Sequence, residues 1–191
     1  LSDAWTARFD YSYSQDHYND DQARVMAYDS ATGNLTRRVD ATHGSTQKMH
    51  ATRADLQGNV VIGGFYNEIL TGLAYENYDL LRTDMIRCKN IKGFNIYNPV
   101  YGTLDKCSSV SASDSDQRTQ QESYAGYVQD ALYLSDKWIA IAGVRYQYYT
   151  QYAGKGRPFN VNTDSSDQKW TPKAGLVYKL TPSVSLFGNV A

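Results

Sequence analysis

The sequence has no run of about eighteen consecutive apolar residues, and its mean hydropathy is −0.57. A transmembrane helix needs such a run, so none is expected. A membrane location is still open, because the strands of a transmembrane barrel alternate between apolar and polar residues and leave no hydropathy peak.

Motifs of common enzymes and nucleotide sites are also missing. There is no G-x-S-x-G, P-loop, H-E-x-x-H or dinucleotide fingerprint. The three histidines, His17, His43 and His50, do not have the spacing of metal ligands. The net charge of −1 gives no reason to expect a nucleic-acid partner. We therefore predict that the chain is not an enzyme and binds no cofactor or nucleic acid itself.

Cysteine is scarce, with only Cys88 and Cys107. Two cysteines without a C-x-x-C spacing favour a disulfide in an oxidising compartment over two free thiols in a reducing one. The bridge would close a loop of about twenty residues and stabilise it by about 3 kcal/mol in the chain-entropy model.

Tyrosine is abundant, with 17 Tyr against 5 Phe and 3 Trp. Tyrosine suits strands and places where one end of a side chain is dry and the other wet. In the stretch 137–152, apolar residues occupy every second position from Trp138 to Tyr148, and the alternate positions become polar at Arg145. A period of two predicts a long strand with two unlike faces.

Similar alternation recurs along most of the chain, and no helical pattern does. The first strand is expected to continue, after a polar break at 19–21, through Ala23–Asp29. Short turns are predicted near Gly63, at 135–137 and at 181–183, and long loops at 87–121 and 153–167. The predicted strands lie in the segments 5–29, 50–60, 68–78, 122–134, 138–152, 169–180 and 184–191.

Long strands with short turns at one end and long loops at the other are typical of an outer-membrane antiparallel β-barrel. The apolar face would meet lipid and the polar face a wet lumen. A soluble antiparallel sandwich with one wet face is the alternative fold. The strands are longer than the usual five or six residues and end in Tyr, which favours the barrel. Since the chain starts and ends inside strand patterns, we interpret it as a piece of a longer protein.

Four segments resemble the TonB-dependent ferric-siderophore receptors, and are most similar to the hydroxamate type that takes up ferrichrome and ferrioxamine. They read EILTGLAYE, FNIYNPVYG, YVQDALYLSDKWIAIAGVRYQYY and KWTPKAGLVYKLTPSVSLFGNVA. The resemblance covers most of residues 46–191 and, more loosely, the first forty-five. It implies a 22-stranded barrel with a plug domain in its lumen. Residues 1–191 would be part of the barrel, with the plug outside this chain.

The resemblance also implies a function in the outer membrane of a Gram-negative bacterium. Such receptors bind a ferric siderophore outside the cell and import it with energy from TonB. The expected partners are the siderophore, the plug, TonB through the region missing here, and outer-membrane lipid and lipopolysaccharide. The Cys88–Cys107 bridge would lie in an extracellular loop. The alternatives are a passive porin-like channel and a soluble carbohydrate-binding β-domain.

Candidate site residues follow from the same resemblance. Tyr28 matches one of two pocket aromatics of the family and Met26 replaces the other, with both expected to face inward. A further family aromatic falls at Met85 or Ile86, and this departure hints at a different siderophore. Other ligand candidates are Tyr97, as an exposed loop aromatic, and Tyr149, as an inward residue. Polar residues expected to face the lumen and the plug are Arg53, Asp55, Glu76, Gln129 and Arg145.

Overall fold

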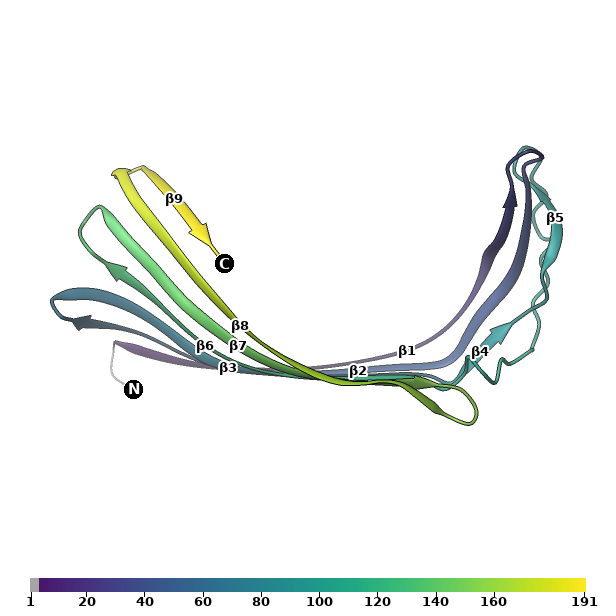
Figure 1. Cartoon of the computed structure of the whole chain (residues 1–191), viewed down its shortest axis with the longest axis horizontal. Helices are drawn as coiled ribbons and strands as arrows, with labels where there is room; N and C mark the ends of the chain where they lie inside the picture. The colour runs from purple at the N-terminus through teal and green to yellow at the C-terminus, as the bar shows by residue number, and fades with distance from the viewer. Residues whose placement is uncertain (1–3) are drawn as a thin grey trace.

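The structure, a computed structural model, describes residues 4–191 and consists of antiparallel β-strands joined by turns and loops (Figure 1). Within these residues, no helix is long and apolar enough to cross a membrane. The strands are β1 (Trp5–Asp29), β2 (Asn34–Ile62), β3 (Phe65–Arg82), β4 (Asp84–Arg87), β5 (Ile91–Asn95), β6 (Gln117–Tyr133), β7 (Trp138–Lys155), β8 (Asn160–Thr181) and β9 (Val184–Val190).

The strands form one sheet in the order β1-β2-β3-β6-β7-β8-β9, and β4 and β5 pair with the outer part of β2. The sheet is curved into a trough (Figure 1). The turns β2–β3, β6–β7 and β8–β9 lie at one end of the trough. The β1–β2 hairpin, the β3–β6 connection and the β7–β8 hairpin lie at the other.

Alternation along each strand gives the sheet two unlike faces. On β7, Trp138, Val144 and Tyr146 lie on one face, and Arg145 and Gln147 lie on the other. The strand register extends these two faces across neighbouring strands. Arg145 lies opposite Tyr127 and Thr171 on one face, and Tyr146 lies opposite Gly126 and Trp170 on the other. We call these the apolar face and the charged face. The alternation predicted from the sequence is therefore confirmed.

All three predicted short turns are confirmed, including the β2–β3 turn at Gly63 and Gly64. Both of these glycines have positive φ, +61° and +87°, which favours glycine over residues that carry a Cβ. The predicted long loop at 153–167 is wrong: β7 and β8 stay paired as far as Lys155 and Asn160. The paired ends are polar because they extend past the apolar bands described below, so no apolar residue marks them as strand.

The predicted loop at 87–121 is shorter and more ordered than expected. β6 begins at Gln117, and the connection contains β4 and β5. The polar break expected at 19–21 is also wrong, because β1 continues through it. There β2 carries an extra residue, and Gly44, with φ +69°, donates its N–H to the side chain of Asn19.

Large apolar side chains are exposed along the apolar face. Phe9, Leu73 and Trp170 are 69%, 68% and 64% exposed. A soluble sandwich would cover such a face with a second sheet. The buried apolar cluster lies elsewhere, under the disulfide-linked loop, and comprises Val39, Ala41, Ile86 and Cys88 with Leu104 and Cys107 packed against it.

Candidate functional site

Aromatic side chains form two bands on the apolar face. Near the short turns, the rings of Trp138 and Tyr178 lie 4.5 Å apart. Nearer the other end, Tyr146 and Trp170 lie 4.8 Å apart. The strand between the bands, residues 138–146, is about as long as a tilted strand needs to cross a hydrocarbon layer, ~9–11 residues. Aromatic bands of this kind mark the two interfaces of a transmembrane barrel.

The charged face carries a polar cluster at mid-height. Arg53 Nε lies 2.7 Å from the Asp55 carboxylate and donates a hydrogen bond of 2.9 Å to the Tyr127 hydroxyl. The Tyr127 hydroxyl in turn donates to Asp55. Since Arg53 and Asp55 come from β2 and Tyr127 from β6, the cluster bridges β3, which lies between them.

An open hollow of about 710 Å³ lies over this cluster. Four of the five residues predicted to face the lumen line it: Arg53, Glu76, Gln129 and Arg145. Asp55, the fifth, lies on the same face, opposite Arg8 and Gly72. The predicted shared orientation is thus found in the structure, while contact with a plug stays a prediction.

Tyr149 lies on the charged face between Ser123 and Asp167 and is 41% exposed. It is farther from the short turns than Arg145, as expected. Tyr97 is 74% exposed in the loop after β5, and its ring covers Gly33 in the β1–β2 turn. Both residues are exposed enough for a ligand to reach them, and their contact with a ligand stays a prediction.

The expected inward orientation of Tyr28 does not hold, because β1 is irregular at Met26. Met26 is an extra residue in β1, since Val25 pairs with Arg37 and Ala27 with Thr36. The bulge shifts the alternation, so Tyr28 pairs with Leu35 on the side of β2 opposite Arg38. A strand pattern cannot predict such a bulge, because the bulge depends on how the partner strand pairs.

Met85 is also placed differently from expectation. Its side chain is only 7% exposed, and its N–H donates a 3.0 Å hydrogen bond to Ser115 Oγ. Ile86, the other residue that could match the family aromatic, is 5% exposed and belongs to the buried apolar cluster. Neither side chain is open to a ligand in this structure, because β4 pairs with β2 and the loop residues 111–116 cover it.

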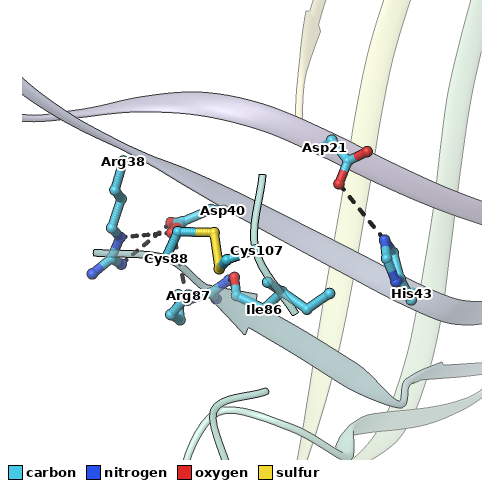
Figure 2. The surroundings of a disulfide bond; sticks show 8 residues. All are labelled: Asp21, Arg38, Asp40, His43, Ile86, Arg87, Cys88 and Cys107. Carbon is cyan, nitrogen blue, oxygen red and sulfur yellow. Dashed lines mark hydrogen bonds and ion pairs between the residues drawn. A yellow bond between two sulfur atoms is a disulfide. The ribbon is translucent and has the colours of Figure 1, made fainter. Parts of the chain in front are cut away.

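The predicted disulfide is present: Cys88 and Cys107 are bonded, with Cα atoms 5.7 Å apart (Figure 2). The bridge links β4 to the loop that packs on the β1–β2 hairpin. Lys106 of the same loop donates to the Asp21 carboxylate of β1, so the loop is also joined to the β1–β2 hairpin. The hydrogen bond from Lys106 lowers the pKa of Asp21, and His43 Nε2 lies 3.6 Å from the same carboxylate.

Sequence reasoning missed an arginine cluster around Asp40, part of which is shown in Figure 2. Asp40 is 2% exposed, and its carboxylate accepts from Arg38 at 2.6 Å and from Arg24 at 3.1 Å, with Arg87 4.0 Å away. Burial acts to raise the pKa of Asp40, but the hydrogen bonds from Arg38 and Arg24 and the charge of Arg87 outweigh it, so the pKa is lowered. The only signal in the sequence was the density of charge in RRVD at 37–40.

Among residues 4–191, no group of three or more His, Cys, Asp or Glu side chains is arranged to hold a metal ion. In the polar cluster of the charged face, the Arg53 guanidinium, the Asp55 carboxylate and the Tyr127 hydroxyl bond to one another. This arrangement is suited to holding a polar surface or a polar ligand by hydrogen bonds and charge.

Comparisons with known proteins agree with this geometry. A family model described as "TonB dependent receptor-like, beta-barrel" matches residues 1–191. The metal-pseudopaline receptor CntO of Pseudomonas aeruginosa (strain UCBPP-PA14) is 27% identical over 198 residues, covering 100% of this chain and 27% of the relative. The chain thus spans about a quarter of the length of that relative.

Solved structures show the same fold. The closed form of the ferric-catecholate import receptor Fiu from Escherichia coli K12 gives a TM-score of 0.77 at 15% identity, covering 99% of this chain and 30% of that one. The ferric preacinetobactin receptor BauA from Acinetobacter baumannii gives 0.78 at 18% identity, covering 99% and 28%.

These relatives are receptors, in agreement with the prediction that the chain is not an enzyme. Members of the matched family are outer-membrane proteins of Gram-negative bacteria. The family match over the whole sequence and the banded apolar face lead to one conclusion: the chain belongs to the TonB-dependent receptor β-barrel family.

Proposed function

We propose that the full-length protein is an outer-membrane receptor that binds a ferric siderophore outside the cell and imports it with energy supplied through TonB. One observation carries the proposal: a single sheet has a banded apolar face suited to lipid and a charged face with an open hollow. The names of the relatives support it, since one is a receptor for metal-pseudopaline and two are receptors for ferric siderophores.

In this proposal the short turns face the periplasm and the disulfide-linked loop lies outside the cell. The long outer part of β2 fits this orientation. Starting from the turn at Gly63, a membrane crossing takes about ten residues, so the segment 34–45 lies well outside the lipid. The plug would occupy the hollow and contact Arg53, Asp55, Glu76, Gln129 and Arg145.

The siderophore class is a finer part of the proposal. A hydroxamate is the class that the resemblance of the sequence segments implies. The relatives named above are receptors for a catecholate, for preacinetobactin and for metal-pseudopaline, so a panel of chelates is needed. The candidate contacts are Tyr97 and Tyr149, which are both exposed.

The test measures how tightly ferric chelates bind to the full-length receptor in detergent. Quenching of tryptophan fluorescence reports the binding. Ferric hydroxamates, ferric catecholates and the iron-free chelators are compared. We expect one ferric complex to bind with a Kd below about 1 μM and its iron-free form to bind more weakly. A correctly folded receptor that binds no ferric chelate would contradict the proposal.

A further inference from the structure

The arginine cluster lies on the charged face, beyond the membrane-spanning part of the sheet. β1 alternates without an extra residue from Asp10 to Arg24, because the irregularity near Asn19 inserts its extra residue into β2. Arg24 therefore shares the face of Asp10, and its partner Arg38 does too. Asp40 and Arg87, which are paired across β2 and β4, lie beside them.

The cluster is held in place by a buried carboxylate and extends to a neighbouring hairpin. Asp40 joins Arg24, Arg38 and Arg87, and Arg87 Nε also lies 3.6 Å from Asp114. Asp114 is paired in turn with Lys155 at 2.8 Å. Two carboxylates thus face four cations, so the network has an excess of positive charge. The next carboxylate on this face of β1 is Asp20, which is separated from Arg24 by Gln22.

Part of that charge is open to solvent. The side chain of Arg24 is 58% exposed, whereas those of Arg38 and Arg87 are 21% and 19% exposed. The buried Asp40 carboxylate holds several guanidinium groups in place. Because the Arg24 group is open to solvent, its free N–H groups can donate hydrogen bonds to a ligand. Arginine binds anionic oxygens, such as those of carboxylates and phosphates, often through two parallel hydrogen bonds.

We propose that Arg24 and Arg38, organised by Asp40, form an external docking site for metal chelates with a net negative charge. This inference rests on the proposed function and names the charge class of its ligand. Three catecholates around Fe³⁺ leave a net charge of −3, whereas three hydroxamates around Fe³⁺ leave a neutral complex. The site would favour the first kind of complex and raise its local concentration above the hollow.

Arg37 provides a matched control, because it is next to Arg38 in β2 but lies on the opposite side of the strand. Its guanidinium carbon lies 3.7 Å from the centre of the Phe94 ring, and it donates to Thr103 Oγ1. Arg37→Gln removes one positive charge from the same hairpin without touching the cluster, and is compared with R24Q and R38Q singly as well as with the double variant. Unchanged thermal unfolding by circular dichroism would show that each variant is folded.

The experiment uses the full-length receptor in detergent, with ferric tris-catecholate and a neutral ferric trihydroxamate as probes, at low and high salt. We expect wild-type affinity for the catecholate complex to fall about tenfold or more as salt rises, since salt screens exposed charges. The variant R24Q/R38Q should bind the catecholate complex about tenfold more weakly at low salt and lose most of the salt dependence. Neither R37Q nor the neutral probe should show these changes.

Each other outcome has a defined meaning. Equal losses in R37Q and R24Q/R38Q, or no loss in R24Q/R38Q, would overturn the docking site. Binding of the neutral complex alone would also overturn it, while the proposed receptor function would stand. Binding of neither complex by folded wild-type receptor would contradict both.

Discussion

Tyr127 of β6 occupies the space above Gly72 of β3. A Cβ built on Gly72 would lie 2.5 Å from the Tyr127 hydroxyl and 2.4 Å from an Asp55 carboxylate oxygen. The small residue at 72 therefore allows Tyr127 to reach across β3 to Arg53 and Asp55. Gly72 on one strand and Tyr127 on the next together make the polar cluster of the charged face possible.

Gly72→Ala should displace Tyr127 and break its hydrogen bond to Asp55. Loss of one partner of such a hydrogen bond typically costs about 1–3 kcal/mol. We expect lower resistance to thermal unfolding, measured by circular dichroism on the detergent-solubilised receptor. Gly126→Ala is the control, because a Cβ there would meet only Leu73 Cδ2, at 3.5 Å. Equal effects of the two changes would show that the Tyr127 contact does not depend on Gly72.

Replacing Arg53 and Arg145 by Met should slow import without abolishing ligand binding. A plug held by polar contacts can exchange them for water as it moves, whereas a plug held by apolar contacts exposes apolar surface. We expect the rate of TonB-dependent iron uptake to fall several-fold while the Kd for the chelate stays constant. Lys48→Met is the control, since Lys48 lies on the other face of β2, opposite Gln15. Unchanged uptake in the double variant would count against polar contacts to the plug.

Removing the disulfide by Cys88→Ala and Cys107→Ala should loosen the external loop and leave the membrane-spanning strands intact. The bridge spans 19 residues and is expected to contribute about 3 kcal/mol by restricting the unfolded loop. We expect faster protease cleavage within 96–110 and little change in the unfolding of the barrel. Lys106→Gln, which removes the ion pair to Asp21 but keeps the bridge, should have a smaller effect. A cleavage rate equal to that of the wild type would refute the role of the bridge.

Acid should loosen the connection between β3 and β6. A hydrogen bond from Arg157 lowers the pKa of Asp116, and one from Lys155 lowers that of Asp114. For a carboxyl whose folded-state pKa is lowered, the stabilisation is complete above the unfolded value, about 4, and is lost as pH falls through the folded value. We expect constant protection of residues 111–116 from pH 8 to 5 and a loss below about pH 4.

Hydrogen exchange followed by mass spectrometry, corrected for intrinsic rates, measures this protection. The variant R157Q should lower protection at neutral pH and reduce its dependence on acid. The paired residues of β2 and β3 beside the turn at Gly63 provide an internal reference, because they lie at the other end of the sheet from these carboxylates. Loss of protection already between pH 7 and 5 would contradict the assignment to these two carboxylates.

Residue patterns predicted the membrane-spanning strands, where one face must be apolar, and the short turns between them. The alternation through 138–152 and the turn at Gly63 reflect local requirements, and both appear in the structure as predicted. The polar ends of β7 and β8 could not be recognised as strand, since outside the membrane neither face must be apolar. The bulge at Met26 and the burial of Met85 depend on pairing with β2, which no local pattern reveals.

In the candidate site too, some residues could be placed from local patterns and others depended on the path of the chain. Arg53, Asp55 and Arg145 could be assigned to one face from strand parity alone. The cluster around Asp40 could not, because it joins residues from β1, β2 and β4 through a connection whose path was unknown from sequence. The disulfide was predictable from the number and spacing of cysteines, but its packing against Val39 and Ala41 was not.

The most direct test of the central claim is uptake of radioactive ferric chelate by cells that carry the full-length receptor as their only route for that chelate. The account predicts saturable uptake that stops when TonB is deleted or the proton gradient is collapsed, while binding at the cell surface persists. Uptake that continues without TonB and rises linearly with chelate concentration would contradict the account and indicate a passive channel.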